Sequence, residues 1–204
     1  MKAGLRLFDM NMPEEINRRV IDSISTLLFA PTETALSNLR NENVPGKIYL
    51  VGDVHVYILK KWLSIAEERS SILERLCLRS HDYVLVALHR AENVDNIDRL
   101  AKFLQLINKI SQYYKVVFPV HPRTRKNINQ AGLDHLLTKN ENIIILQPLG
   151  YIDFIKLLNH SRMVLTDSGG VQREVYLFKK PVVILRKNME WVEPVKYRQA
   201  LLCD

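Results

Sequence analysis

Beyond residue 80 the chain alternates short, almost fully apolar segments with longer stretches of helical character. Val, Ile and Leu occupy most positions of the apolar segments, without the polar alternation that marks a half-exposed strand. Near-continuous apolar strands separated by helices are typical of a parallel sheet that is covered by helices on both faces. This pattern predicts a Rossmann-like α/β domain whose strands are residues 83–88, 115–120, 142–147, 162–166 and 181–185.

The start of the chain shows a shorter version of the same pattern. Apolar residues recur at helical spacing over residues 14–26, and the apolar segment 27–30 follows as a predicted strand. Thr32 is placed to cap a second helix that runs to about Asn41, and residues 47–51 form another predicted strand. We interpret this part as the last βα units of a similar sheet.

The two patterns define the predicted domain organisation. A chain of 204 residues accommodates one large domain or parts of two, because single cores stop growing near ~250–300 residues. We expect residues 1–56 to be the remnant of an N-terminal Rossmann-like domain and residues 57–204 to form a C-terminal one. The charged stretch 57–78 is predicted to be a helix that connects them.

The apolar runs and the cysteines exclude other classes of protein. The longest unbroken apolar run, residues 83–88, is far shorter than the ~18–20 residues that a membrane-spanning helix needs, so no membrane association is expected. The first residues lack the charged region and apolar core of a secretory signal. Cys77 and Cys203 lie far apart without a pairing pattern, which predicts reduced thiols in a cytoplasmic protein.

The charge balance points to an anionic partner. The chain carries 29 Lys and Arg against 22 Asp and Glu, a net charge of +7, which indicates nucleic acid, a membrane surface or a phosphorylated small molecule. The basic residues form only short clusters, such as 123–126, without a nucleic-acid-binding motif. Solvated helix faces therefore explain them better, and no nucleic-acid partner is expected.

Polar clusters follow four of the predicted strands directly. They are residues 89–93 (His-Arg-Ala-Glu-Asn), 121–124 (His-Pro-Arg-Thr), 148–151 (Pro-Leu-Gly-Tyr) and 167–170 (Asp-Ser-Gly-Gly). In open α/β sheets, ligands bind at the carboxyl ends of the strands. The coincidence of four clusters at these ends predicts a binding site there.

The last cluster carries the clearest physical signal. Ser168, Gly169 and Gly170 precede a helix predicted over residues 171–178, so free backbone amides and the positive end of a helix dipole face the site. Glycines allow phosphate oxygens to approach the backbone, and Glu174 is placed to accept ribose hydroxyls. The alternative interpretation is a plain capped helix with a glycine turn.

His89 and His121 follow neighbouring strands, and each has an arginine within two residues, Arg90 and Arg123. The two histidines are candidates for acid/base catalysis or for donating hydrogen bonds to phosphate, and the alternative is a structural role. Near the N-terminus, Glu14 opens a predicted helix, where an acidic residue usually complements the helix dipole. No His, Cys or carboxylate cluster has metal-ligand spacing, so no metal site is predicted.

Taken together, these motifs resemble the non-hydrolysing UDP-N-acetylglucosamine 2-epimerase family. HRxEN together with DSGGxQxE is highly specific to it, and the motifs occur in the family's order across almost the whole chain. The matching segments are Ala-Gly-Leu-Arg at 3–6, residues 12–18, Phe-Ala-Pro-Thr-Glu-Thr at 29–34, residues 51–54, His-Arg-Ala-Glu-Asn at 89–93, residues 121–123 and 149–151, Thr-Asp-Ser-Gly-Gly-Val-Gln-Arg-Glu at 166–174, and Leu185-Arg186 with Glu190.

The resemblance implies a GT-B-like fold, in which two Rossmann-like domains hold a nucleotide sugar in the cleft between them. Family enzymes invert C2 of the sugar by eliminating UDP to a 2-acetamidoglucal and adding it back on the other face. They interconvert UDP-GlcNAc and UDP-ManNAc without a cofactor, usually to supply cell-surface polysaccharide. The family commonly forms homodimers, so a homodimer is expected.

By position in the motifs, the resemblance also implies individual roles. Glu14 and His89 match catalytic residues of the family. Residues expected to bind the UDP-sugar are Arg18, Arg90, Glu92, His121, Arg123, Tyr151, Ser168, Gly169, Gly170 and Glu174. Among them, the Ser-Gly-Gly segment is expected to hold the diphosphate, the last glutamate the ribose, and the tyrosine to lie near the uracil.

The sequence also departs from the family pattern. Lys2 stands where the family carries a catalytic Glu, and Met189 stands where it usually carries Thr. The resemblance implies a chain that is shorter than the family at both ends, with an incomplete N-terminal domain. A UDP-binding relic without a full acid/base set is therefore an alternative, as is a GT-B glycosyltransferase, although the HRxEN and PEExNR motifs argue against the latter.

Overall fold

The computed structural model describes residues 3–138, 140–186 and 200–203. Lys2, Met189 and Glu190, which the sequence analysis singled out, lie outside these residues. The described chain forms two compact units, one up to Lys60 and one from Lys61 onward. Within the described residues, no helix is both long enough and apolar enough to cross a membrane.

The second unit is built on one parallel sheet of six strands in the order β5-β4-β3-β6-β7-β8. The strands are β3 (Tyr83–Ala87), β4 (Lys115–Pro119), β5 (Ile143–Leu146), β6 (Met163–Thr166), β7 (Val182–Leu185) and β8 (Ala200–Cys203). The five strands predicted from apolar runs are confirmed, each within one or two residues at its ends. The prediction of five was nevertheless wrong in number, because β8 adds an edge strand parallel to β7.

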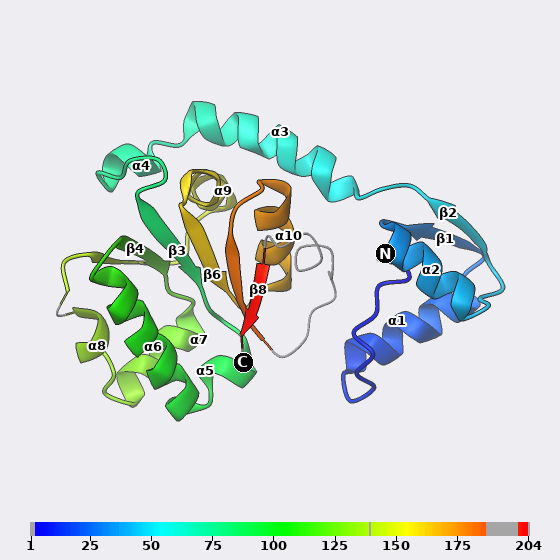
Figure 1. Cartoon of the computed structure of the whole chain (residues 1–204), viewed down its shortest axis with the longest axis horizontal. Helices are drawn as coiled ribbons and strands as arrows, with labels where there is room; N and C mark the ends of the chain where they lie inside the picture. The colour runs from blue at the N-terminus through cyan, green and yellow to red at the C-terminus, as the bar shows by residue number, and fades with distance from the viewer. Residues whose placement is uncertain (1–2, 139, 187–199, 204) are drawn as a thin grey trace. The chain divides into compact units, whose positions relative to one another are not determined.

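Helices connect the successive strands from β3 to β7 and cover both faces of this sheet (Figure 1). On the way from β3 to β5 the chain forms α5 (Ala91–Val94), α6 (Ile97–Ser111), α7 (Pro122–Gln130) and α8 (His135–Thr138). It then crosses back, and α9 (Tyr151–His160) and α10 (Gly169–Leu177) lie on the opposite side. The strand order thus reverses between the neighbours β3 and β6, which makes their carboxyl ends the topological switch point where ligands bind in such sheets.

The core of this unit explains why its strands are recognisable in the sequence. Val84, Leu85 and Val86 of β3 are completely buried, because helices cover both faces of the strand. On α6, Leu100, Leu104 and Ile107 recur at helical spacing and pack against the sheet with no more than 1% exposure. These contacts hold the carboxyl ends of the strands in fixed register.

Two predicted helices begin or end elsewhere than expected. The single connector helix predicted over residues 57–78 is instead two helices, α3 (Val54–Arg69) and α4 (Ile72–Arg75). The helix is interrupted at Ser70. The Ser70 hydroxyl accepts the N–H of Ile72 and donates to Asp153 of α9. The helix predicted over 171–178 begins at Gly169, so both glycines lie in its first turn.

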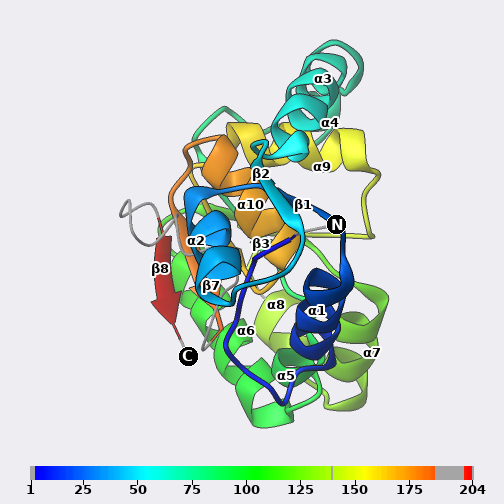
Figure 2. The ribbon, with the colours of Figure 1, turned by 90° about the vertical axis from the view of Figure 1, so that its right-hand side faces the viewer.

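The first unit, blue to cyan in Figures 1 and 2, contains two helices and a small sheet. Pro13 opens α1 (Pro13–Ile24), and β1 (Leu27–Ala30) pairs in parallel with β2 (Lys47–Leu50). Between these strands, the Thr32 side chain accepts the N–H of Ala35 and caps α2 (Glu33–Asn41), as predicted. Apolar side chains of the strand pair are largely exposed: Leu27, Phe29, Tyr49 and Leu50.

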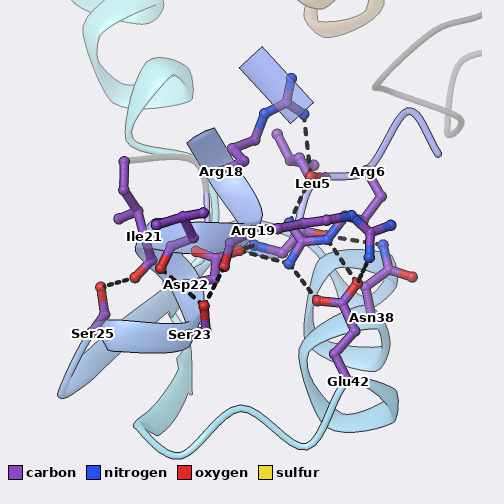
Figure 3. Close-up of polar contacts among 12 residues, drawn as sticks. Leu5, Arg6, Arg18, Arg19, Ile21, Asp22, Ser23, Ser25, Asn38 and Glu42 are labelled. Atoms are coloured by element: carbon purple, nitrogen blue, oxygen red, sulfur yellow. Dashed lines mark hydrogen bonds and ion pairs between the residues drawn. The ribbon is translucent and has the colours of Figure 1, made fainter. Parts of the chain in front are cut away.

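Buried ion pairs attach the extended segment 3–7 to both helices of the first unit (Figure 3). Arg6, only 3% exposed, donates to both carboxylate oxygens of Glu42 at 2.9 and 2.6 Å and lies 2.8 Å from Asp22. These hydrogen bonds hold the pKa of Glu42 below its ordinary value. Asp22 also accepts the backbone N–H of Gly4 at 3.0 Å, so the same carboxylate binds the backbone of this segment and the Arg6 guanidinium.

Gly4 is required at the centre of this arrangement. Its φ is +75°, and a Cβ at this position would lie 2.2 Å from the carbonyl oxygen of Ala35. The resulting close approach allows Asn38 of α2 to donate to the Gly4 carbonyl at 2.9 Å.

We predict that Arg6→Met destabilises the first unit by about 3–5 kcal/mol, because it leaves the Asp22 carboxylate buried without its cation. The exposed Arg40→Met is the matched control and should cost below about 1 kcal/mol. Native-state hydrogen exchange of the α1 and α2 amides measures both effects. Equal losses of protection in the two variants would contradict the assignment.

Candidate functional site

The loops that follow β3 and β6 leave the sheet side by side. The two strands pair in parallel, with Ala87 opposite Thr166. Thr166 donates its hydroxyl proton to the Ala87 carbonyl at 3.0 Å and accepts the N–H of Ser168 at 3.0 Å. Register alone therefore brings the predicted clusters 89–93 and 167–170 together at the switch point.

Asp167 is the residue on which these two clusters converge. Its side chain is completely buried. The carboxylate accepts the backbone N–H of His89 at 3.1 Å, the N–H of Arg90 at 3.0 Å, and the side-chain amide of Asn93 at 3.0 Å. A buried carboxylate requires this many donors, because desolvation of its charge is otherwise costly.

Asn93 extends the same network to a third strand. Its amide nitrogen donates to Asp167 and also to the carbonyl oxygen of Leu185 at 3.0 Å, where β7 ends. The carboxyl ends of β3, β6 and β7 are thus joined by two fully buried side chains.

His89 lies at the edge of this network with its side chain 43% exposed. Its Nδ1 is 3.4 Å from Asp167 Oδ1, and its ring centroid is 5.9 Å from that of His121. Burial lowers the pKa of His89 below its ordinary value. Asp167 opposes this shift, whereas His121 and Arg90 add to it. The imidazole is therefore biased toward the neutral form, which a proton acceptor requires.

His121 is oriented by a different contact. It is the N-cap of α7, and its Nδ1 accepts the N–H of Arg123 at 3.3 Å. The Arg123 side chain forms a bidentate pair with Asp95, which raises the pKa of the guanidinium and lowers that of the carboxyl. The structure thus brings His121 to His89 but places the Arg123 guanidinium on Asp95.

A cavity of about 180 Å³ opens beside the two histidines. Its walls come from the carboxyl ends of β3 and β4, from the segment after β5, and from α9 and α10: Ala87, Leu88, His89, Pro119, His121, Pro148, Phe154 and Val171. An apolar cavity with a few convergent polar groups is the usual form of a small-molecule site.

The N-terminus of α10 adjoins this cavity through Val171. Ser168 is the N-cap, but within the described chain its side chain makes no capping hydrogen bond. A Cβ built on Gly169 meets no atom within 4 Å, so the space over the first turn is open. Uncapped amides, the helix dipole and open space together suit an anion.

Glu174 and Tyr151 are already in contact. The Tyr151 hydroxyl donates to Glu174 Oε1 at 2.8 Å, and the tyrosine ring packs edge-on against Trp62 of α3 at 6.0 Å. Burial and Glu174 raise the pKa of Tyr151, which keeps the phenol protonated as a donor. The two residues predicted to hold ribose and to lie near uracil thus form one hydrogen-bonded pair.

Glu92 lies between two cations. Its Oε1 is 3.9 Å from Arg90 Nη1 and 3.8 Å from Nε of Arg186, whose side chain is almost fully buried. Arg186 follows β7 directly, so this group continues the polar edge of the sheet. The carboxylate itself is 58% exposed and accessible to a ligand.

The first unit contains the two remaining predicted residues. Glu14 is exposed in the first turn of α1, whereas the adjacent Glu15 is completely buried and accepts the N–H of Leu7 at 3.0 Å. Arg18 donates to the Leu5 carbonyl at 3.2 Å and lies 3.7 Å from Glu15 (Figure 3). Glu14 therefore has the accessible carboxylate of the pair.

A larger cavity of about 500 Å³ lies along α6, between Asn96 and Leu106, and reaches Leu185 and Cys203. None of the predicted site residues lines it. Charged residues of α6 also line this larger cavity. Size alone does not define a site, and the smaller cavity lies at the switch point, beside two histidines that follow neighbouring strands. Among the described residues, no three His, Cys, Asp or Glu side chains are grouped so as to hold a metal ion.

The residues that support the site were not predicted from the sequence. Asp167 and Asn93 stand within the recognised motifs, but neither was assigned a role. A charged residue directly after a largely apolar strand is the only local signal for Asp167. Its partners lie 74 to 78 residues away in the chain, so only the strand pairing discloses them.

Comparison with known proteins identifies the family. The family described as UDP-N-acetylglucosamine 2-epimerase matches residues 1–204. The chain belongs to this family. The match includes both units and every residue of the candidate site.

Several relatives are similar over nearly the whole chain. A UDP-N-acetylglucosamine 2-epimerase homolog of Methanococcus maripaludis is 44% identical over 96% of this chain and 54% of its own length. A UDP-2,3-diacetamido-2,3-dideoxy-D-glucuronate 2-epimerase of Pseudomonas aeruginosa is 43% identical over 96% of this chain and 53% of its own length. The chain thus spans about half the length of these relatives.

Solved structures agree in fold. The Methanocaldococcus jannaschii UDP-GlcNAc 2-epimerase, crystallised in complex with UDP-GlcNAc and UDP, is 42% identical, with a TM-score of 0.87. The alignment covers 99% of this chain and 57% of that one. The fold is accordingly that of the GT-B-like epimerases, with Rossmann-like parallel sheets.

Proposed function

We propose that this chain contributes to a UDP-GlcNAc 2-epimerase, which interconverts UDP-GlcNAc and UDP-ManNAc. One observation carries the proposal: a half-exposed histidine biased toward its neutral form lies at the switch point, next to an uncapped helix N-terminus. The first feature suits proton transfer, and the second suits a diphosphate. The family match and the UDP-GlcNAc bound to the Methanocaldococcus jannaschii relative support it.

In this proposal the second unit binds the nucleotide. The amides after Ser168, including those of Gly169 and Gly170, hold the diphosphate oxygens. Glu174 accepts the ribose hydroxyls, and Tyr151 lies near the uracil while its hydroxyl orients Glu174. The position of Glu174 one helical turn after Gly170 supports this order along the ligand.

The chemistry requires a base for the weakly acidic C2 proton and cations for the departing diphosphate. In the elimination, a base takes the proton from C2, the C1–O bond breaks, and UDP leaves with the electron pair. Re-addition reverses these steps on the other face of C2. We assign acid/base roles to His89 and Glu14 and substrate contacts to Arg18, Arg90, Glu92, His121 and Arg123.

The test is to incubate the purified chain with UDP-GlcNAc in D₂O and follow C2 by NMR. Deuterium entry at C2 together with UDP-ManNAc formation supports the proposal. UDP binding by calorimetry without exchange would instead identify a chain that retains the nucleotide site and lacks turnover. The Lys2 substitution for the family's catalytic Glu is the observation that favours this second outcome.

A second substrate is favoured by the Pseudomonas aeruginosa relative. That 2-epimerase is named for a diacetamido uronate sugar and is almost as similar to this chain as the homolog from Methanococcus maripaludis. Running the exchange experiment with both UDP-sugars decides between them, because the preferred substrate has the larger kcat/KM.

We predict that Gly169→Asp weakens UDP binding roughly 100-fold or more, since a carboxylate would face the diphosphate at short range. Gly169→Ala is the matched control for size. It should change the affinity less than about 10-fold, because a Cβ has open space there. Isothermal titration calorimetry measures both affinities. Equal affinities for UDP in the Asp and Ala variants would contradict binding of the diphosphate at the N-terminus of α10.

His89→Asn is expected to lower kcat by roughly 10²–10⁴-fold, the usual contribution of a general acid or base. UDP affinity should stay within about 3-fold, because the diphosphate is assigned to α10. Initial rates and calorimetry on the same preparation separate the two effects. An unaltered kcat would exclude His89 from the chemistry.

We also propose that the chain forms a homodimer through the exposed apolar strand pair of the first unit. Parallel strands are normally covered on both faces, and Phe29 and Tyr49 are about half exposed. Light scattering should give twice the 23.8 kDa chain mass. Phe29→Glu should give the single mass, and the exposed Tyr113→Glu of the second unit should not. A wild-type mass of one chain contradicts this interface.

A cytoplasmic location is part of the same proposal. Cys77 and Cys203 are both free and exposed, as thiols are in a reducing compartment.

A further inference from the structure

We propose that Asp167 is a positioning residue that sets the tautomer of His89, so that Nε2 of the imidazole is the proton acceptor of the site. The structural part concerns the ligand-free chain and is independent of the proposed function. The catalytic consequence rests on that function.

The geometry supplies the first argument. The His89 N–H lies 3.1 and 3.3 Å from the two Asp167 carboxylate oxygens, which also accept from Arg90 and Asn93. The Nδ1 atom faces the same carboxylate at 3.4 Å. The Asp167 carboxylate thus fixes the backbone at His89 and Arg90 and also faces the His89 Nδ1 atom. This distance is longer than a good hydrogen bond, and catalytic hydrogen bonds are often long in ligand-free structures and shorten when the ligand binds.

The chemistry of the acceptor supplies the second argument. An ionised carboxylate only accepts hydrogen bonds and has about four lone-pair sites. The N–H groups of His89 and Arg90 and the Asn93 amide occupy three of them, which leaves one for Nδ1–H of His89. Asparagine at this position would offer one oxygen and turn an NH₂ group toward some of those donors. The donor set therefore specifies a carboxylate rather than an amide.

The tautomer follows from this contact. Facing an acceptor, Nδ1 of neutral His89 carries the proton, and Nε2 presents its lone pair. His121 has the opposite arrangement, because its Nδ1 accepts the N–H of Arg123 and its Nε2 then carries the proton. The neighbouring rings thus present one acceptor and one donor, which suits proton abstraction beside an oxygen-rich ligand.

Asp167 also links proton transfer to ligand binding. Ser168 follows it directly, and the Ser168 N–H is fixed by Thr166, which in turn binds the Ala87 carbonyl at the end of β3. The anion-binding turn and the His89 loop therefore share one anchor. Displacement of either one strains the other.

The charges around His89 fix the direction of its titration. Asp167 after β6, His121 at the N-cap of α7 and Arg90 of its own loop face the imidazole, and only Asp167 raises its pKa. Asp167→Asn removes that contribution, so the His89 pKa falls further. The acidic limb of a pH–rate profile that depends on neutral His89 then moves to lower pH.

The first experiment uses the wild-type chain with ¹⁵N-labelled histidine. At neutral pH, long-range ¹H–¹⁵N spectra should show His89 protonated at Nδ1 and His121 protonated at Nε2. His89→Asn and His121→Asn identify the two spin systems. A His89 protonated at Nε2 overturns the proposal, whether or not the chain has epimerase activity.

The second experiment compares Asp167→Asn with Asp22→Asn, a buried carboxylate of the first unit. In Asp167→Asn, His89 should switch to the Nε2–H tautomer, its pKa should fall, and kcat should drop about 100-fold or more, by a larger factor than KM rises. Asp22→Asn should leave the tautomer and pKa of His89 unchanged. An unchanged tautomer in folded Asp167→Asn overturns the proposal.

If Asp167→Asn does not fold, the wild-type spectrum decides the tautomer. The second variant is then Asn93→Ala, in which the His89 tautomer is measured. It removes the Asn93 amide that donates to Asp167 and to the Leu185 carbonyl but keeps the carboxylate beside Nδ1, so the Nδ1–H form should persist. Loss of the Nδ1–H form in Asn93→Ala would show that the conformation of the loop, rather than the Asp167 carboxylate, determines the His89 tautomer. That result would contradict the proposed role of Asp167.

Discussion

The completely buried Asp167 carboxylate finds its hydrogen-bond donors only where the carboxyl ends of β3 and β6 meet. Removing a carboxylate from water costs several kcal/mol unless donors replace the solvent. Here the donors come from the backbone after β3 and from Asn93, which also holds the end of β7. All three donors lie in residues 89–93, so the pairing of β3 with β6 places them beside Asp167, and Asn93 attaches the same loop to the end of β7.

The same arrangement separates the buried Asp167 carboxylate from the polar groups that remain accessible at this edge of the sheet. Backbone and side-chain donors enclose the Asp167 charge, and its side chain has no exposed area. The uncapped amides of α10 and the exposed imidazole of His121 face outward instead. The net charge of +7 therefore says less about where an anion binds than the few donors at the switch point do. The Arg123 guanidinium, for example, is bound by Asp95.

Much of the fold was predictable because burial on both faces leaves a local trace. The run of Val and Leu in β3 exists because helices cover both of its faces, and the same holds for β4. The strand β8 is also an apolar run, Ala-Leu-Leu-Cys, but Leu201 is 68% exposed, and the parallel pairing with β7 that makes this segment an edge strand is non-local. The start of α10 was misplaced because Gly disfavours helix interiors, whereas first-turn positions tolerate it.

Individual residues of the candidate site were predictable from the sequence, but the contacts between them were not. Histidines and glycines at strand ends are visible in any α/β sequence, so His89, His121 and Gly169 could be selected without a structure. The role of Asp167 could not be, because its partners are set by strand order and register. The engagement of Tyr151 with Glu174, and of Arg123 with Asp95, likewise depends on non-local packing.

The central claim is that a nucleotide diphosphate binds at the carboxyl ends of β3 and β6. Amide chemical shifts of the ¹⁵N-labelled chain during titration with UDP test it most directly. The account predicts that the largest shifts occur at Ser168, Gly169 and Gly170, with smaller ones at His89 and Glu174. Shifts concentrated around Lys102 and Phe103 beside the larger cavity, or no shifts at millimolar UDP, would contradict it.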